Sequence, residues 1–280
     1  MSKQTLLAVL AHPDDESFGT GGTLALYASR GVDVHLVCAT RGEVGDVAPE
    51  LLEGFDSIAQ LRESELRCAA GHLGLAGVHF LDYRDSGMPG SPDNKHPRAL
   101  AAQPLEEVAA NVVCYIRDLK PQVVVTFDPY GGYGHPDHIA IQRATALAFE
   151  QAGNPEFAPG SGPAYAPERL YFHTMPRGFM KFAVKLLPLF GRDPKKFGNN
   201  GDVDLTAIAA QEFPIHARVN ISSVLEKKEK AGACHASQGG GMGGGGPISL
   251  FMRLFANTEA FMQVYPPVKP GSRIATDLFA

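Results

Sequence analysis

The chain has 280 residues, of which 44% are hydrophobic, and its 25 basic and 30 acidic side chains give a formal net charge of −5 at pH 7. The hydrophobic share excludes wholesale disorder, and a mildly acidic chain without a basic tract is not expected to bind nucleic acid. No apolar run reaches the roughly 18–20 residues of a membrane span, and the N-terminal segment, with carboxylates directly after a short apolar run, does not resemble a signal peptide.

The first half of the chain alternates between short apolar runs and helical stretches. Strands are predicted over Thr5–Leu10, Val32–Ala39, Val78–Leu81 and Gln122–Phe127, and helices over Thr23–Ser29, Ser57–Leu73, Leu105–Leu119 and Pro136–Gln151. Short apolar strands separated by such helices predict βαβ units. The expected fold is therefore α/β: a Rossmann-like, mostly parallel sheet with helices on both faces and an active site at the carboxyl ends of the strands.

The second half of the chain is less regular. We predict a strand over Arg169–Thr174, a charged helix over Ser222–Ala233, and a helix at the edge of the core over Phe179–Leu187, for which a membrane-surface contact is the alternative. The glycine-rich segment 239–246 is expected to be flexible, either as a disordered loop or as a lid over a substrate. Because there is no internal repeat and no clear linker, residues 1–280 are predicted to form a single domain.

The cysteines, Cys38, Cys68, Cys114 and Cys234, lie far apart in the sequence and form no CxxC pair. This spacing favours reduced thiols over a disulfide framework or a cysteine-ligated zinc site. Reduced thiols in turn predict a cytoplasmic location.

Two loops that follow the strongest apolar strands combine histidines with carboxylates. One runs from His12 to Glu16 (HPDDE) and the other from Tyr133 to His138 (YGHPDH). Loops after the strands of a parallel sheet form its ligand site. If they meet, His12, Asp15 and His138 supply two imidazoles and one carboxylate, a set that suits a catalytic zinc whose fourth position is left to water.

The remaining side chains of these loops suit hydrolysis. Zinc lowers the pKa of a bound water from about 16 towards 7 and polarises a carbonyl oxygen. Asp14, a carboxylate beside the metal that is not itself a ligand, is the candidate to accept the proton of that water. His135 is left to act as general acid or to stabilise an oxyanion, and Asp137 to orient it or tune its pKa. Tyr133 offers a hydroxyl donor for the developing oxyanion.

Two other classes of function fit parts of this pattern. Two histidines and one carboxylate also describe the facial triad of non-haem iron oxygenases, but that chemistry needs neither Asp14 nor His135 as acid and base. A non-enzymatic or nucleotide-binding module is suggested by the glycines of Gly19–Gly22. Their spacing is not GxGxxG, however, and the acidic loop before them would repel a pyrophosphate.

The two histidine-carboxylate motifs resemble those of a known family. AHPDDE near the N-terminus and GHPDH after a later strand are similar to the motifs of the PIG-L/LmbE-like family of zinc-dependent N-acetylglucosaminyl deacetylases. The resemblance covers most of the chain and includes Thr40–Glu43, Arg62, Glu65, Tyr83–Met88 and His235–Gln238. The stretch from Asp85 to Met88 is similar to the branch that acts on mycothiol precursors and mycothiol conjugates.

The resemblance implies specific roles for the residues of the two loops. One zinc ion per chain would be held by His12, Asp15 and His138, with Fe²⁺ or another divalent cation as the alternative. The implied catalytic groups are Asp14 as general base, His135 as general acid with Asp137 as its partner, and Tyr133 near the oxyanion.

The resemblance also implies substrate contacts. Arg62, Asp85 and Glu43 would contact the sugar or its aglycone, and Met88 would line the pocket. Alternatives from the residues alone stay open: Arg62 as a solvated helix residue paired with a neighbouring glutamate, Asp85 as a turn residue, and His235 as a structural hydrogen-bonding group.

The implied activity is hydrolysis of the amide of an N-acetylglucosamine-containing small molecule, which yields acetate and a free amine. The alternative is an amidase that cleaves a larger acyl group from a glucosaminyl conjugate, such as a mycothiol-like thiol S-conjugate. The expected partner is thus a small acetylated amino sugar, and a homo-oligomer is left open.

Overall fold

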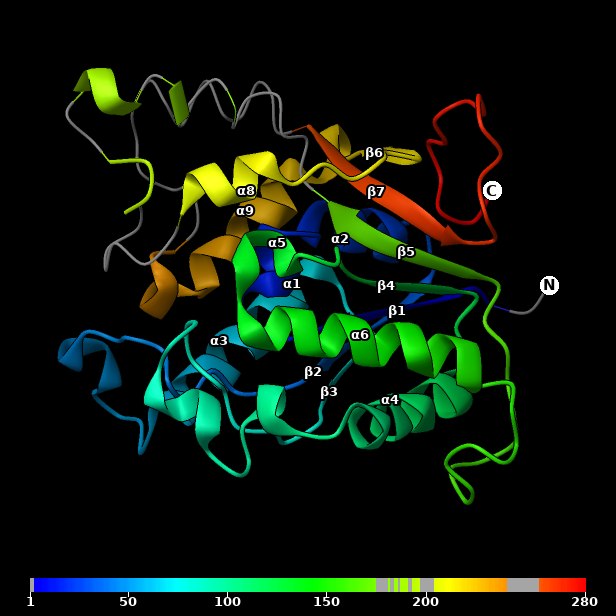
Figure 1. Ribbon diagram of the computed structural model, residues 1–280, viewed down its shortest axis with the longest axis horizontal. Coiled ribbons are helices and arrows are strands. Elements are labelled where there is room, and N and C mark those ends of the chain that lie inside the picture. The colour runs from blue at the N-terminus through cyan, green and yellow to red at the C-terminus, as the bar shows by residue number, and fades with distance from the viewer. Residues whose placement is uncertain are drawn as a thin grey trace.

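The computed structural model describes residues 3–174, 181, 184–185, 187–190, 193–196, 204–240 and 257–280. Within them a seven-stranded sheet has the order β3-β2-β1-β4-β5-β7-β6 and lies between helices (Figure 1). The strands are β1 (Thr5–Leu10), β2 (Asp33–Cys38), β3 (Gly77–Phe80), β4 (Val123–Phe127), β5 (Arg169–Thr174), β6 (Ala217–Asn220) and β7 (Thr258–Tyr265). The α-helices are α1 (Asp15–Phe18), α2 (Gly21–Ser29), α3 (Ile58–Leu73), α4 (Leu105–Leu119), α5 (Gly131–Gly134), α6 (Pro136–Gln151), α8 (Leu205–Ala210) and α9 (Leu225–Cys234). Short 3₁₀ turns are η1 (Pro49–Leu52), η2 (Pro92–Lys95), η3 (Leu100–Ala102), η4 (Leu187–Phe190), η5 (Ser222–Val224) and η6 (Ala236–Gln238).

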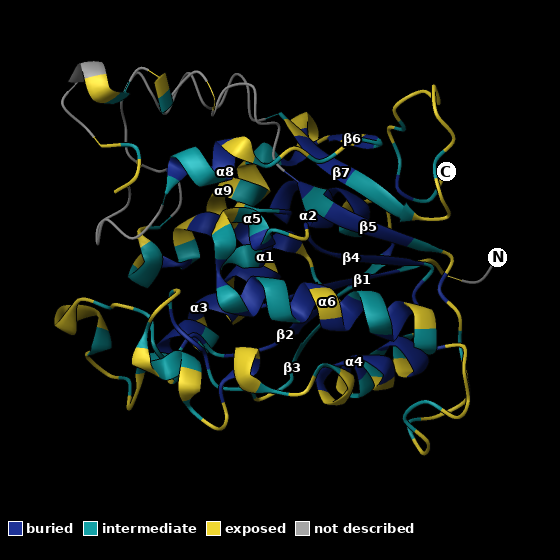
Figure 2. Cartoon of the chain, in the orientation of Figure 1, coloured by how far each residue is buried: buried dark blue, intermediate teal, exposed yellow. Residues whose placement is uncertain are grey.

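The centre of the sheet is parallel and apolar on both faces. β1 pairs in parallel with β2 and β4, and the parallel pairing continues to β3 on one side and β5 on the other. Every residue of β4 is buried, as are all residues of β1 after Thr5 (Figure 2). Strands of this kind need cover on both faces, and α4 and α6 cover one face while α2, α3 and α9 cover the other. The predicted α/β class is confirmed.

The helix that follows the second motif begins where its sequence directs. Pro136 occupies the first helical position, where a missing N–H is harmless. His135 caps the helix, because its Nδ1 accepts the backbone N–H of Asp137 at 3.2 Å. His138 therefore lies in the first turn of α6, directed back towards the end of β4.

The two strands at one edge of the sheet, β6 and β7, are absent from the elements predicted above. β6 is only four residues long and alternates buried with exposed positions, and β7 mixes apolar residues with Glu259 and Gln263. β7 runs antiparallel to both β5 and β6. Such strands have neither the length nor the continuous apolar character that marks a buried parallel strand.

The expectation of four reduced thiols is wrong for one pair. Cys68 and Cys234 form a disulfide, with Cα atoms 5.9 Å apart, whereas Cys38 and Cys114 are free. The two partners are 166 residues apart in the sequence. They meet because α9 packs against α3, a tertiary contact that the spacing of cysteines in the sequence does not reveal.

Several expectations fall outside what the structure describes. Residues 241–246 of the glycine-rich segment and most of the stretch 179–187 lie outside the described residues.

Among the described helices, none is both long and apolar enough to cross a membrane. The single domain, the cytoplasmic location and the oligomeric state stay predictions.

Candidate active site and metal centre

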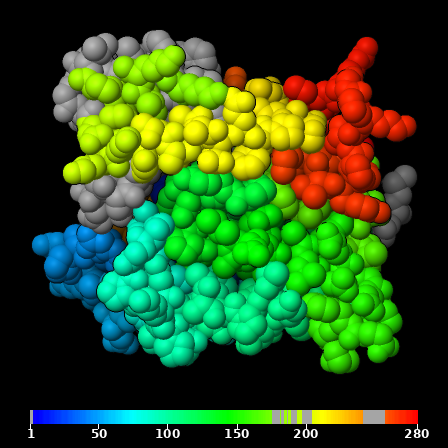
Figure 3. Space-filling view, viewed as in Figure 1, coloured from blue at the N-terminus to red at the C-terminus, as the bar shows by residue number. Residues whose placement is uncertain are grey.

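The two motifs meet at the carboxyl ends of the two central strands. The chain leaves β1 towards β2 and β3 on one side and then returns to β4 on the other side of β1. Such a reversal of strand order opens a crevice between the loops that follow the two strands. α1 follows β1 and α5 follows β4, and they lie near each other at this end of the sheet (Figure 1). α8 packs against α5 above the green segment that carries α5 and α6 (Figure 3).

Three side chains from the two motifs form a small triangle in which each brings a donor group towards the other two. His12 Nδ1 lies 3.2 Å from His138 Nε2, and each nitrogen faces a different oxygen of Asp15: His12 Nδ1 lies 3.6 Å from Oδ2 and His138 Nε2 lies 3.3 Å from Oδ1. A zinc ion held at about 2.0–2.1 Å in tetrahedral geometry requires donor atoms about 3.3–3.4 Å apart. The spacing and the chemistry of the three donors therefore fit a divalent cation of this size.

In the rings of His12 and His138, the outer nitrogen, which is the one that does not face Asp15, already has a hydrogen-bond partner. His138 Nδ1 lies 3.1 Å from the carbonyl oxygen of Gly131, and His12 Nε2 lies 3.1 Å from Asp137 Oδ2. If each outer nitrogen donates its proton to these acceptors, both inner nitrogens present lone pairs towards Asp15. A histidine ligand is commonly oriented in this way by a carbonyl or carboxylate behind it.

His135 lies beside this triangle but is not suited to complete it. Its ring is within 4.6 Å of the His12 ring, centroid to centroid, and 5.1 Å of the His138 ring. Its Nδ1 accepts the backbone N–H of Asp137, so the ring proton of the neutral form sits on Nε2. Burial and the neighbouring rings of His12 and His138 lower the pKa of His135 to about 2, which keeps the ring neutral.

The buried charges around the triangle of His12, Asp15 and His138 favour the binding of a cation. Four carboxylates converge on this region: Asp14, Asp15, Asp85 and Asp137. Among the ion pairs of the described residues, Arg62 is the arginine that contacts one of them, Asp14. Although burial disfavours a charged ring, the carboxylates of Asp137, Asp15 and Asp85 raise the pKa of His12 well above its ordinary value. Burial opposes the ionisation of Asp15, but the rings of His138 and His12 hold its pKa below the usual range. A concentration of buried carboxylates is costly without positive charge.

Asp14 stands next to the triangle without joining it. Its Oδ2 accepts a hydrogen bond from Arg62 Nη2 at 3.1 Å, and its backbone adopts φ 126°, a conformation that L residues rarely adopt. Burial raises the pKa of Asp14 to about 7, opposed by Arg62 and reinforced by Asp15. Strained backbone and a raised carboxyl pKa both concentrate at functional sites, and a carboxyl group poised near neutrality suits proton transfer.

Asp137 has a different partner from the one implied by the resemblance. Its carboxylate contacts His12 rather than His135, and it also accepts hydrogen bonds from the backbone N–H and the hydroxyl of Ser86. Its link to His135 is made by its backbone N–H. Asp137 is therefore placed to orient a candidate metal ligand.

Tyr133 is the most open of the candidate catalytic residues. It is 38% exposed, and its ring lies edge-on to His138 and His135, with centroids 4.9 and 6.0 Å apart. Burial of its hydroxyl raises the pKa of Tyr133 above its ordinary value, so the hydroxyl keeps its proton. It can thus act as a hydrogen-bond donor at the mouth of the site.

Arg62 is a buried part of the site, which excludes the interpretation of a solvated helix residue. Only 3% of the residue is exposed. Its Nη2 donates to the carbonyl of Pro13 at 2.7 Å and to Asp14, and its Nη1 donates to the carbonyl of Gly42 at 3.1 Å. A Cβ at Gly42 or Gly45 would overlap the guanidinium, so both glycines leave the space that Arg62 occupies.

The other predicted substrate contacts line the loops after β2 and β3. Glu43 Oε2 accepts the backbone N–H of Asp85 at 3.1 Å. Asp85 faces His12 Nε2 at 3.5 Å and accepts the backbone N–H of Gly87 at 2.8 Å, so it is both a turn residue and a neighbour of the candidate metal centre. Met88 is half-buried in the same loop.

Several supporting residues were not assigned a role by the sequence. Glu16 is fully buried, and its two oxygens accept the backbone N–H of Asp14 at 3.0 Å and face His235 Nε2 at 2.7 Å. Glu65 accepts both the N–H and the hydroxyl of Ser237, at 2.7 and 2.6 Å. The only signals for them were the place of Glu16 in the HPDDE motif and of Glu65 and the His235–Gln238 segment among the residues that carry the family resemblance. His235 is thus a structural hydrogen-bonding group behind the first loop.

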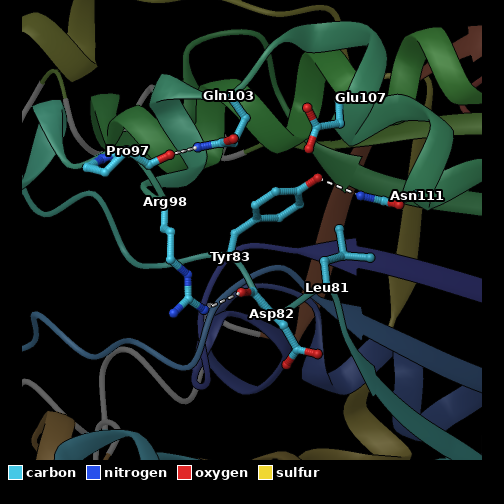
Figure 4. A pocket seen from close by; sticks show the side chains of 8 residues that line it. All are labelled: Leu81, Asp82, Tyr83, Pro97, Arg98, Gln103, Glu107 and Asn111. Atoms are coloured by element: carbon cyan, nitrogen blue, oxygen red, sulfur yellow. Dashed lines mark hydrogen bonds between the residues drawn. The ribbon is translucent and has the colours of Figure 1, made fainter.

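A separate surface hollow of about 240 Å³ includes none of the residues proposed for catalysis or metal binding. It is lined by Leu81, Asp82, Tyr83, Pro97, Arg98, Gln103, Glu107 and Asn111 (Figure 4). Its polar groups are largely paired with one another, as in the 2.6 Å bond from Asn111 to the Tyr83 hydroxyl. The residues that line this hollow therefore offer no set of metal-binding side chains like that of His12, Asp15 and His138.

Known proteins are similar to this chain in sequence and in fold. Over 242 residues the chain is 38% identical to a 1D-myo-inositol 2-acetamido-2-deoxy-alpha-D-glucopyranoside deacetylase of Geodermatophilus obscurus, with 83% of this chain and 82% of that protein covered. The N,N'-diacetylchitobiose deacetylase of Pyrococcus horikoshii is similar in structure, with a TM-score of 0.63 at 20% identity over 97% of this chain and 88% of the other. The 4-carboxy-2-hydroxymuconate hydratase GalB of Pseudomonas putida reaches 0.60 at 19% identity over 96% and 100%, so the fold alone does not decide the reaction.

The family comparison covers all three residues of the candidate metal centre. Residues 7–149 match the PIG-L family, described as GlcNAc-PI de-N-acetylase. This range includes both loops that supply His12, Asp15 and His138, and it accounts for more than half of the chain. The chain therefore belongs to the PIG-L family.

Proposed function

We propose that this protein is a zinc-dependent deacetylase that hydrolyses the acetamide of an N-acetylglucosaminide, with the inositol-linked sugar named for its relatives as the first candidate. The observation that carries the proposal is the triangle of His12, Asp15 and His138, whose donor atoms lie 3.2–3.6 Å apart. The name of the relative at 38% identity supports the substrate class. A divalent cation bound there would activate a water molecule and polarise the acetamide carbonyl.

Asp14 is the proposed general base. Its carboxylate is next to the metal-binding residues, is not one of them, and is fixed by Arg62 from the side. It accepts the proton of the attacking water and, once protonated, returns that proton to the nitrogen of the leaving amine. A carboxyl group whose pKa is raised towards neutrality can do both steps near pH 7.

His135 is the proposed hydrogen-bond donor to the substrate oxygen. Because Nδ1 accepts the N–H of Asp137, the ring presents an N–H at Nε2. This role is one of the two that its residue type allows, and it needs no positive charge on the ring. Tyr133, the more exposed donor, is proposed to share the developing charge from the open side.

Release of free amine tests the proposal. The substrates are N-acetylglucosamine, its inositol-linked glycoside and the same glycoside with larger acyl groups, each assayed with zinc-loaded protein, with Fe²⁺-loaded protein under anaerobic conditions, and after removal of metal by a chelator. We expect metal-dependent release of acetate without oxygen, and a rate about 10²–10⁴ lower for Asp14→Asn. The exposed carboxylate of Asp46 provides the control Asp46→Asn.

Three outcomes would count against this assignment. Hydrolysis that survives both metal removal and Asp14→Asn would exclude the mechanism. A strict requirement for oxygen would favour the iron oxygenase class instead. Faster cleavage of a larger acyl group than of acetyl would make the protein an amidase of the same kind of sugar.

A further inference from the structure

A second cluster of metal-binding side chains lies outside the active site. Cys68 on α3 and Cys234 at the end of α9 are joined as a disulfide. His72 follows Cys68 by one helical turn, so its side chain lies on the same face of α3. One ligand atom from each of the three residues lies within 4.8 Å of the others. Cys68 and His72 are exposed and Cys234 is half-buried, so the cluster can be reached from solvent.

The chemistry of this cluster differs from that of the active site. Two thiolates and one imidazole are soft to borderline donors, which select zinc and other thiophilic cations rather than Mg²⁺ or Ca²⁺. The disulfide blocks them, because both sulfurs are already bonded to each other. Metal binding and the disulfide are therefore mutually exclusive states of one site.

We propose that Cys68, His72 and Cys234 form a redox-gated binding site for a thiophilic divalent cation such as Zn²⁺. A dithiol reductant transfers two electrons and two protons to the site: the S–S bond breaks, two cysteine thiols form, and the reductant becomes a disulfide. One cation then binds the two sulfurs and His72, two protons leave to solvent, and water takes the remaining position.

The position of the cysteine-histidine cluster in the fold means that both its disulfide state and its cation-bound state would stabilise the region behind the active-site loop. Cys234 precedes His235, which pairs with Glu16, and Glu16 in turn accepts the N–H of Asp14. On α3, Glu65 lies one turn before Cys68 and holds Ser237 in η6. Both the disulfide and a bound cation tie α3 to the end of α9, behind the loop that carries the proposed general base. Under reducing conditions a cation would preserve this tie.

Cobalt binding provides a direct test, because Co²⁺ bound by thiolate sulfur gives an intense near-ultraviolet charge-transfer absorption, which histidine and carboxylate ligands do not. Protein purified without reductant is first checked by intact mass for the loss of two hydrogens. It is then titrated with Co²⁺ before and after reduction. We expect the absorption only in reduced protein, together with one more equivalent of bound Zn²⁺ than in oxidised protein.

Matched variants assign the absorption to this site. His72→Ala leaves the disulfide and the thiols in place, and we expect it to weaken cobalt binding on the order of 10–100-fold. The double variant Cys68→Ser, Cys234→Ser should lose the absorption, whereas Cys114→Ser, which removes an exposed free thiol, should keep it. Failure to find the disulfide, no absorption in reduced wild type, an unchanged absorption in the double variant, or full affinity in His72→Ala would each overturn the proposal. None of these readouts depends on deacetylase activity, so they stand whatever the substrate.

Discussion

Arg62→Lys distinguishes two roles for the buried arginine, as a substrate contact or as a residue that positions the general base. The guanidinium makes three hydrogen bonds to the protein, to the carbonyls of Pro13 and Gly42 and to the carboxylate of Asp14. Both carbonyls and the carboxylate belong to loops that follow strands of the central sheet. The geometry therefore predicts that Arg62 acts on the reaction through Asp14.

The expected effect of Arg62→Lys on stability and on kcat follows from the hydrogen bonds that the substitution removes. Lysine keeps the charge, but a single ammonium cannot reproduce the fork that reaches all three acceptors. Loss of two bonds to a charged donor removes about 1.5–3 kcal/mol each from the folded state. The part of this loss that disturbs Asp14 in the transition state should lower kcat about 10–100-fold, or about 1.4–2.8 kcal/mol.

The assay is steady-state release of amine over a range of substrate concentrations, with the melting temperature measured in parallel. We expect kcat to fall while KM changes less than about threefold. Gly42→Ala should act in the same direction, because a Cβ there overlaps the guanidinium. Arg67→Lys, on the exposed face of the same helix, is the control. If Arg62→Lys raises KM with kcat intact, Arg62 contacts the substrate and this reasoning is wrong.

Three further predictions concern the metal, the neighbouring histidine and the far edge of the sheet. His138→Ala should lose the active-site metal and its activity, measured by metal analysis and amine release; full metal content in this variant would move the site elsewhere. His135→Gln should retain about tenfold more activity than His135→Ala, since an amide replaces a neutral N–H donor; equal losses would indicate that His135 transfers a proton. Although burial opposes ionisation of Glu259, Lys228 and the amide of Thr23 hold its pKa below the usual value. Its stabilising effect is therefore present above about pH 4.5 and lost as pH falls. Glu259→Gln should lower the free energy of urea unfolding by about 2–4 kcal/mol at pH 7, and a cost that persists undiminished at pH 3 would contradict this ionic role.

The parts of the site that the sequence predicted are those encoded over short stretches. TLLAVL and QVVVTF form β1 and β4 with boundaries within one residue of the prediction. Because a parallel sheet aligns the carboxyl ends of its strands, the loops after them had to face the same crevice. His12 and His138 thus meet although 126 positions separate them.

The parts that sequence reasoning missed depend on contacts between distant elements. Cys68 meets Cys234 across 166 positions, and Glu16 meets His235 across 219. A buried arginine on a helix has the same local pattern as a solvated one. The orientation of Arg62 is decided by the space left at Gly42, in another loop. Packing of α9 on α3 and on α1, rather than any local preference, brings the cysteine pair and the Glu16–His235 pair together.

The arrangement of the site separates the residues proposed to hold the metal from those proposed to contact the substrate. His12, His138 and Asp137 are buried, and each is fixed by hydrogen bonds to the loops after β1, β3 and β4. Tyr133 and Met88 lie at more open positions of the loops. A change in the inner group leaves a buried carboxylate or imidazole without its partner, at a cost of about 1–3 kcal/mol or more. Substitution at the open positions carries no such cost, so we expect that substrate preference can vary there while the proposed metal centre stays the same.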